Sequence, residues 1–216
     1  HGSALDQIVP TRTRFYFISG CKQPTIGKII RRNMRSGEEE YQIQMTDGDG
    51  TVPLGSSDIG GVPSTQRLYV KNVKHSDMPS APGVRPISIS LLNGSIDYTN
   101  LPSNITQNIS NCGIRRGRIV SVHSPVDLNV YDSLGNHVGP GANNTIDLGI
   151  DGAAYEDIGN NKFIYLPMDN NENYTVQLDA TATGTFSFRV ADTNIEQTTQ
   201  TVFYSDIPIV PASAAQ

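Results

Sequence analysis

Arg118-Ile-Val-Ser-Val122 and Val126-Asp-Leu-Asn-Val-Tyr131 are short runs rich in β-branched residues, and they open a series that fills the second half of the sequence. Runs of this composition between turn residues are typical of β-strands. Five more follow at short intervals, over residues 145–150, 162–167, 174–178, 185–190 and 198–204. Seven short strands without a helical period predict an all-β antiparallel sandwich over residues 112–216, which we interpret as an accessory domain.

The segment before the predicted sandwich has a different composition. Residues 96–111 are polar and, after Asp97, uncharged, which is typical of a linker. Residues 1–95 then form a separate part with both α and β signals. Its opening triplet His1-Gly2-Ser3 resembles the remnant of an affinity tag, with a natural start as the alternative.

Within residues 1–95, the aromatic and β-branched run at 14–21 and the shorter run at 68–73 predict strands. Between them, Ser36-Gly37 predicts the turn of a β-hairpin. Over residues 82–92 the apolar positions have helical spacing, although residues 87–91 also alternate as a strand would. The first part is therefore predicted to be α+β, and the whole chain mainly β.

Charge is unevenly distributed between the two halves. The net formal charge is −5, made up of +3 over residues 1–95 and −8 over residues 96–216. An acidic second half argues against a nucleic-acid partner, because phosphate binding requires clustered Lys and Arg. No window approaches the roughly 18 to 20 consecutive apolar residues of a membrane span, so none is predicted.

The two cysteines, Cys21 and Cys112, lie far apart and neither belongs to a CxxC motif, so a zinc site is not indicated. Either one disulfide or two free thiols remains open. The polar, cysteine-poor composition suits a secreted or cell-surface protein, with a cytosolic protein as the alternative.

Two residues have the chemistry and the order expected of a catalytic acid and base. Asp49 lies in a turn flanked by glycines, which can present its carboxylate without crowding, and His75 follows a short predicted strand. In α/β-hydrolases the triad residues occur in the chain order Ser, Asp, His, with the acid and the histidine in loops after late strands. We therefore expect the Asp49 carboxylate to lie within hydrogen-bond reach of a His75 ring nitrogen.

Residues 14–94 carry a resemblance to a known family. Phe15-Tyr-Phe-Ile-Ser-Gly20, Asp47-Gly-Asp-Gly-Thr-Val-Pro53 and Lys74-His-Ser-Asp-Met78 together resemble the carboxy-terminal end of the lecithin:cholesterol acyltransferase family of lipases and acyltransferases. The resemblance implies an α/β-hydrolase fold for this part. It also implies that Asp49, which precedes Gly-Thr-Val, is the triad acid and that His75 is the triad base.

The sequence departs from that family in one respect: no Gly-x-Ser-x-Gly nucleophile motif occurs. The nearest candidate, Gly55-Ser-Ser-Asp-Ile59, lacks the closing glycine. The resemblance therefore implies that this chain is the carboxy-terminal part of an exported ester hydrolase or acyltransferase. Its partner would be an upstream half of the same protein, which carries the serine and through which the ester or lipid substrate is bound. Alone, the chain should be inactive. The alternative is a non-catalytic surface or adhesion module.

No cofactor or metal is expected. Read as an EF-hand loop, the segment from Asp47 would place Val52 where glycine is required and Asp58 where glutamate is required. Solvated loop charge is the simpler interpretation of five acidic residues of the second half, with calcium binding as the alternative; they are Asp127, Asp132, Asp151, Glu156 and Asp157. His123 and His137 are expected to be structural.

Overall fold

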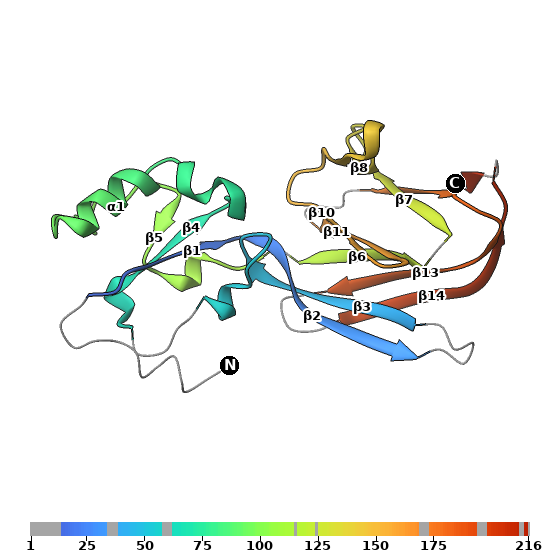
Figure 1. The fold of residues 1–216 in the computed structure, drawn as a ribbon, viewed down its shortest axis with the longest axis horizontal. Coiled ribbons are helices and arrows are strands. Elements are labelled where there is room, and N and C mark those ends of the chain that lie inside the picture. The colour runs from blue at the N-terminus through green and yellow to red at the C-terminus, as the bar shows by residue number, and fades with distance from the viewer. Residues whose placement is uncertain are drawn as a thin grey trace. The chain divides into compact units, whose positions relative to one another are not determined.

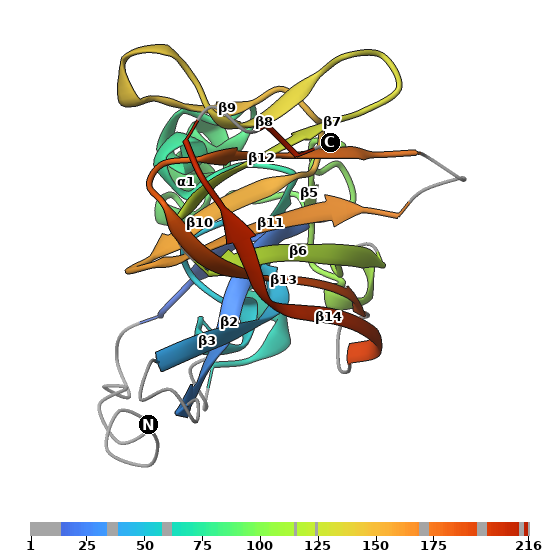
Figure 2. The same ribbon diagram turned by 90° about the vertical axis from the view of Figure 1, so that its right-hand side faces the viewer.

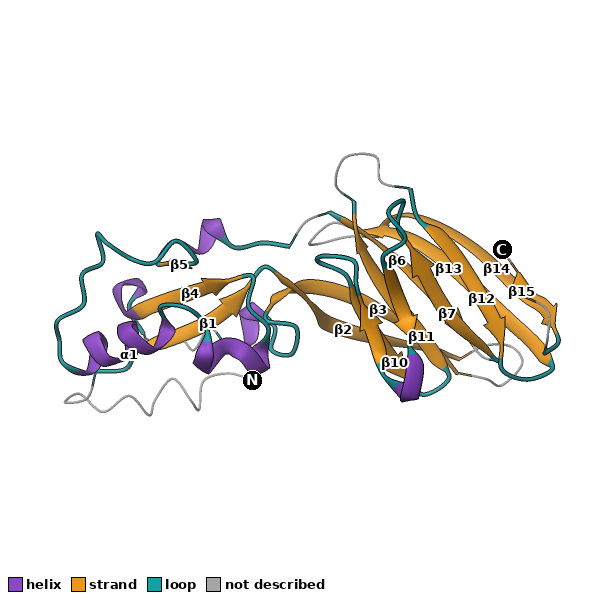
Figure 3. Ribbon diagram, turned by 90° about the horizontal axis from the view of Figure 1, so that it is seen from above, coloured by secondary structure: helices purple, strands orange, loops and turns teal. Residues whose placement is uncertain are grey.

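The structure, a computed structural model, describes residues 14–33, 39–57, 62–114, 116–123, 125–168, 173–193, 198–211 and 214–215 (Figure 1). The protein is mainly β, as Figure 3 shows by its colouring. Its chain divides into two compact units. Unit 1 comprises His1–Gly27 and Thr46–Ile114, and unit 2 comprises Lys28–Met45 and Arg115–Gln216.

Unit 2 is built on two five-stranded sheets, which Figure 2 shows as two layers. One sheet has the order β10-β11-β6-β13-β14 and the other the order β15-β12-β7-β8-β9, and the strand pairs within them are antiparallel. The strands are β6 (Gly117–His123), β7 (Val126–Tyr131), β8 (His137–Pro140), β9 (Ile146–Leu148), β10 (Ala154–Ile158), β11 (Asn161–Pro167), β12 (Thr175–Ala180), β13 (Gly184–Thr193), β14 (Thr198–Ile209) and β15 (Ala214–Ala215).

The core of unit 2 lies between these sheets. Val120 of β6 and Ile164 of β11 pack from the first sheet, and Leu128 of β7 and Val138 of β8 pack from the second. Each of these side chains is at most 1% exposed. Burial of two inner sheet faces against each other is what the alternating pattern predicts, and the sandwich-like, mainly β character of the second half is confirmed.

The predicted strands of this half all have counterparts, but three further strands were not expected. The strand β8 contains Gly139 and Pro140, β10 carries two acidic residues, and β15 is only two residues long. Glycine, proline and acidic residues have low strand propensity, so sequence pattern alone does not mark these segments. Their pairing with β11, β12 and β7, which are distant or longer strands, is what defines them as strands.

The predicted hairpin before residue 49 is present as the two-stranded sheet of β2 (Gln23–Asn33) and β3 (Glu39–Gly48). Its Ser36-Gly37 turn lies outside the described residues. Residues 28–45 belong to unit 2, because Tyr41 N donates to Asn161 Oδ1 at 3.3 Å and Glu40 Oε1 lies 3.6 Å from Arg189 Nη2. The expected boundary, which kept all of residues 1–95 together, therefore differs from the observed division.

Unit 1 has a small sheet of order β1-β4-β5, in which β1 (Phe17–Cys21) and β4 (Arg67–Lys71) are parallel and β5 (Ile105–Thr106) is antiparallel to β4. Helix α1 (Val84–Leu92) packs through Val84, Ile87 and Leu91 into a core with Leu68 and Val70. The helical interpretation of this segment is thus confirmed. The rest of unit 1 contains the short 3₁₀ helices η1 (Leu54–Ser56), η2 (Ser64–Gln66), η3 (His75–Ser80) and η4 (Ile109–Asn111); η5 (Ala142–Asn144) lies in unit 2.

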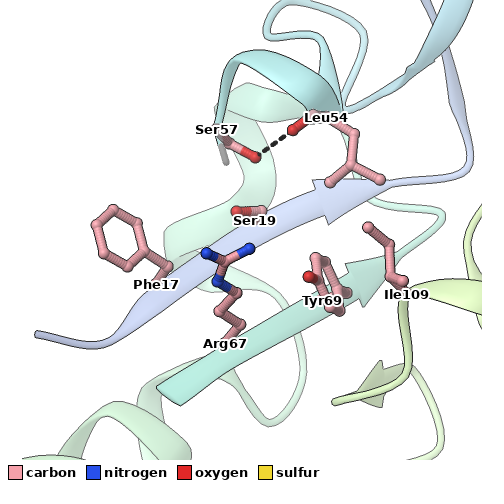
Figure 4. A pocket seen from close by; sticks show the side chains of 7 residues that line it. All are labelled: Phe17, Ser19, Leu54, Ser57, Arg67, Tyr69 and Ile109. Atoms are coloured by element: carbon pink, nitrogen blue, oxygen red, sulfur yellow. Dashed lines mark hydrogen bonds between the residues drawn. The ribbon is translucent and has the colours of Figure 1, made fainter. Parts of the chain in front are cut away.

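A small hollow in unit 1 lies over β1 and β4 (Figure 4). Its walls are Phe17, Ser19, Leu54, Ser57, Arg67, Tyr69 and Ile109. Strand alternation directs Leu68 and Val70 into the α1 core, so their neighbours Arg67 and Tyr69 face the opposite side of the sheet. Arg67 Nε donates to Val62 O at 3.0 Å, which holds this side chain along the sheet.

The expected linker at residues 96–111 is part of unit 1. It contains β5 and η4, and the next residue, Cys112, forms a disulfide with Cys21 across 91 residues of sequence. Polar composition suggested a linker because strand pairing and a covalent crosslink leave no local signal. Within the described part of the chain, no helix has the length and apolar character needed to cross a membrane.

Candidate functional site

The turn that carries Asp49 is held by its own carboxylate. Asp49 Oδ1 accepts hydrogen bonds from Thr51 N at 3.0 Å and Val52 N at 2.7 Å, and Asp49 N donates to Val52 O at 3.3 Å. The residue is 5% exposed. One carboxylate oxygen is therefore used to fix the turn, and the other, Oδ2, remains to bind a different group.

Glycines on both sides make this arrangement possible. A methyl group on Gly20 of β1 would overlap the Asp49 Cβ, so Asp49 sits directly against the end of that strand. Likewise, a methyl group on Gly48 would overlap Val52 O and Thr25 Oγ1. Gly50 has φ of +89°, a conformation that favours glycine, and its N–H donates to Thr25 Oγ1 at 2.9 Å.

His75 is joined to Asp49 by two hydrogen bonds. Its ring Nδ1 lies 2.8 Å from Asp49 Oδ2, and its backbone N donates to Asp49 O at 2.8 Å. It is the first residue of η3, which begins shortly after β4. The two residues expected to pair are thus brought together, with the carboxylate buried and the imidazole side chain 53% exposed.

The carboxylate of this pair is ionised at neutral pH. Burial by itself would raise the pKa of Asp49, but the hydrogen bonds from Val52 N, His75 and Thr51 N outweigh it and hold the pKa below its usual value. Because an ionised carboxylate can only accept, His75 Nδ1 carries the proton and Nε2 of the neutral ring is the acceptor. Nε2, the ring nitrogen that does not contact Asp49, is therefore the one that can accept a proton.

The parallel pairing of β1 and β4 explains why these residues meet. Asp49 contacts Gly20 at the carboxyl end of β1, and His75 follows the carboxyl end of β4 at Lys71. Parallel strands place their carboxyl ends at one edge of a sheet, where catalytic residues of α/β proteins gather. In the sequence, the hairpin of β2 and β3 therefore lies between β1 and Asp49, although Asp49 contacts Gly20 of β1 in the fold.

Asp47, two residues before the candidate acid, has a structural role that the sequence did not reveal. Its Oδ1 accepts from Lys22 N at 2.6 Å and Gly48 N at 3.0 Å, and its Oδ2 accepts from Gly113 N at 2.8 Å. Lys22 and Gly113 each follow one cysteine of the disulfide. Asp47 therefore ties both ends of the Cys21–Cys112 crosslink to the strand that leads into Asp49, although burial raises its pKa.

Among the described residues, one group of three potential metal ligands lies close together, and it consists of Cys21, Asp47 and Cys112. Both cysteines are bonded to each other, so their sulfurs are not thiolate ligands. Of the acidic residues of the second half, Asp127 lies 3.6 Å from Lys162 Nζ, and Asp132 accepts hydrogen bonds within its own turn from Leu134 and Asn136.

The remaining predicted residues have structural partners. His137 lies between Asn129 Oδ1 at 2.9 Å and Asp147 Oδ2 at 3.2 Å and stacks on Tyr131. His123 Nδ1 lies 3.2 Å from Asn161 Oδ1. In the segment that came nearest to a nucleophile motif, Ser57 Oγ donates to Leu54 O at 2.8 Å, and residues 58–61 lie outside the described part.

Comparison of this chain with family models, with curated proteins and with solved structures finds no match.

Proposed function

We propose that this chain is the carboxy-terminal part of an exported, lipase-type ester hydrolase or acyltransferase, and that Asp49 and His75 are the acid and the base of its Ser-His-Asp triad. The observation that carries the proposal is the 2.8 Å contact between Asp49 Oδ2 and His75 Nδ1, together with the second bond between their backbones. The residues that form it are those which the resemblance to the lecithin:cholesterol acyltransferase family singles out.

The chemistry follows from the hydrogen-bond roles. Asp49 fixes the tautomer of His75 and stabilises the imidazolium that forms when Nε2 takes the proton of a serine hydroxyl. The serine oxygen attacks the ester carbonyl, the ester C–O bond breaks, and the leaving alcohol takes the proton from His75 Nε2. Water or a second alcohol, deprotonated by Nε2 in turn, then attacks the acyl-enzyme and releases the serine. In this proposal the serine and the oxyanion-hole amides come from an upstream half.

Two further observations support the proposal. Among the described strands, β1 pairs only with β4, which leaves its other edge for a strand of the upstream half. The Cys21–Cys112 disulfide suits an exported protein, because disulfides persist in oxidising compartments.

The test compares ester hydrolysis by this chain with hydrolysis by the longer protein that includes the upstream half. With a short-chain nitrophenyl ester, the chain alone should give only the buffer rate and the longer protein should turn over. An upstream Gly-x-Ser-x-Gly motif must also be present. If that motif is absent and the longer protein is inactive, the alternative of a non-catalytic surface module is favoured. Hydrolysis by the chain alone would contradict the proposal that the serine lies in the upstream half.

A further inference from the structure

Cys21, one end of the disulfide, lies between the two loops that carry the candidate acid and base. Its carbonyl oxygen accepts a hydrogen bond from Asn72 N at 2.9 Å, directly after the end of β4 and before the loop of the base. The next residue, Lys22, donates its N–H to Asp47 Oδ1 at 2.6 Å, two residues before the acid. One point on the chain is therefore bonded to the loops of both candidate residues.

The backbone at both of these contacts has a conformation that requires support. Lys22 has φ of +69° and Asn72 has φ of +58°, in the left-handed region that few residues other than glycine adopt. Such a conformation persists where neighbouring contacts hold it. The bonds from Lys22 N to Asp47 and from Asn72 N to Cys21 O are contacts of this kind. Loss of either bond should allow the end of the preceding strand to relax.

The carboxylate of Asp47 joins three separate stretches of backbone. Its Oδ1 accepts from Lys22 N and Gly48 N, and its Oδ2 accepts from Gly113 N at 2.8 Å. The residue is only 7% exposed, so water does not simply replace a bond that is lost. Residues 22 and 113 each follow a cysteine, so the positions of their N–H groups depend on the Cys21–Cys112 crosslink.

Little freedom remains between Asp47 and Asp49. Gly48, which separates them, is packed so closely that a methyl group on it would overlap a backbone oxygen. Asp49 itself forms a parallel bridge with Gln23, in the segment that follows the disulfide. A displacement of Asp47 should therefore be passed on to Asp49, whose backbone oxygen and Oδ2 both bind His75.

We propose that Asp47 is a positioning residue, through which the Cys21–Cys112 disulfide holds Asp49 and His75 at hydrogen-bond distance, and that reduction of the disulfide disables the pair. This inference rests on the proposed function, because it assigns a form of regulation to the same site.

The reductant is a dithiol. One of its thiolates attacks a cysteine sulfur and forms a mixed disulfide, and its second thiolate then releases that cysteine. Two electrons and two protons pass to the cysteines, which become thiols, while the reductant becomes a disulfide. The backbone N–H groups of residues 22 and 113 are then no longer held together around the Asp47 carboxylate.

The test measures the ring ¹⁵N chemical shifts of His75 by NMR in the full chain, at mildly alkaline pH with the imidazole neutral. These shifts distinguish a ring protonated at Nδ1 from one protonated at Nε2, and the hydrogen bond to Asp49 sets which form is present. The wild-type protein should show the Nδ1–H form. Reduction with a dithiol, or the double variant Cys21→Ser with Cys112→Ser, should move the shifts toward a mixture of both forms.

Two substitutions of Asp47 separate its contacts. Asp47→Asn keeps an oxygen that can accept from Lys22 N and Gly48 N, but it presents an NH₂ group to Gly113 N. It should therefore move the His75 shifts part of the way toward the mixture. Asp47→Ala removes all three bonds and should move the shifts further.

Asp97→Ala is the matched control. Asp97 also fixes a loop of unit 1, since its Oδ1 accepts from Thr99 N at 2.9 Å, but these partners lie within its own loop. Its loss should leave the His75 shifts unchanged. Amide signals of α1 and β4 check that unit 1 keeps its fold. If Asp47→Ala loses those signals, Asp47→Asn decides.

The proposal is overturned if the wild-type protein does not show the Nδ1–H form, or if His75 keeps its wild-type shifts in Asp47→Asn or after reduction. It is also overturned if Asp97→Ala moves the shifts as much as Asp47→Asn does. The measurement needs neither an ester nor the upstream half. An inactive longer protein would therefore count against the proposed function and leave the positioning role of Asp47 standing.

Discussion

At the scale of single residues, the turn around Asp49 shows how local sequence determines the position of the proposed triad acid. One carboxylate oxygen closes the turn and the other binds His75. The chain order of the two residues and the motifs around them were sufficient to predict that Asp49 and His75 lie within hydrogen-bond reach. They were not sufficient to predict Asp47 as an anchor, because the partners of Asp47 are backbone N–H groups of residues 22 and 113, which only the fold brings close.

The lowered pKa of Asp49 predicts a pH dependence of stability. Its unfolded-state value is about 3.8, and the native value lies below it, so the ionised carboxylate stabilises the fold above pH 4. This contribution should be lost as pH falls through the native pKa. The free energy of unfolding, measured with urea between about pH 2 and pH 6, should therefore decline less steeply in Asp49→Asn than in the wild type. Asp77→Asn, which alters an exposed carboxylate of η3, should keep the wild-type slope.

Gly20 is predicted to be essential for the approach of Asp49 to β1. Gly20→Ala places a methyl group on the Asp49 Cβ and should cost about 1–3 kcal/mol of stability, as overpacking of a close contact does. It should also lengthen the contact between Asp49 and His75, which the Nδ1 proton resonance of His75 reports. Gly55→Ala, where nothing lies within 4 Å, is the control and should change neither quantity. Equal effects of the two substitutions would contradict the packing argument.

At the scale of elements, two features join parts of the sequence that are far apart: the disulfide between Cys21 and Cys112, and the insertion of β2 and β3 between β1 and Asp49. Pattern reasoning found most of the strands and the helix α1, because alternation and helical spacing are local. It grouped residues 28–45 with the first part and took residues 96–111 as a linker, whereas the structure groups them with unit 2 and unit 1, because partners such as Asn161 and Cys21 are distant in sequence.

Reduction of the disulfide should loosen unit 1. A native crosslink over a loop of this length contributes about 2–5 kcal/mol, and Asp47 relies on the backbone next to both cysteines. Hydrogen exchange measured by mass spectrometry should show lower protection in β1, β4 and β5 after reduction, with β6, β11 and β13 unchanged. The double variant Cys21→Ser with Cys112→Ser should match the reduced protein and be insensitive to reductant. Unaltered exchange in β1 after reduction would rule out a stabilising role.

Removal of the hairpin should weaken the sandwich. Replacing residues 28–45 with a short Gly-Ser linker removes the bonds from Tyr41 to Asn161 and from Glu40 to Arg189. Asn161 and Arg189 would then be open to water, so each lost hydrogen bond should cost about 0.5–1.5 kcal/mol. The melting temperature of unit 2 should therefore fall, and a segment of residues 112–216 alone should be less stable than the sandwich with its hairpin. An unchanged melting temperature would show that the sandwich does not need these contacts.

At the scale of the whole molecule, the sequence predicted a mainly β chain and the structure agrees, with two antiparallel sheets around one core in unit 2. The sequence did not predict that residues 28–45 of unit 2 lie between two segments of unit 1. Which unit contains this part of β2 and β3 depends on contacts with residues that are distant in the sequence. The assignment of unit 1 to an α/β-hydrolase is our proposal, and it rests on the parallel pair of β1 and β4 and on the site at their carboxyl ends.

The most direct test of this account is the turnover number of the longer protein, carrying the upstream half, for a nitrophenyl ester when His75 is replaced by alanine. Loss of a triad base lowers kcat by several orders of magnitude, so we expect a decrease of about 10⁴-fold or more in His75→Ala and a smaller decrease in Asp49→Asn. Ser76→Ala, at the exposed neighbour of the base, should keep the wild-type rate. Retention of turnover by His75→Ala would contradict the assignment of Asp49 and His75 as a catalytic pair.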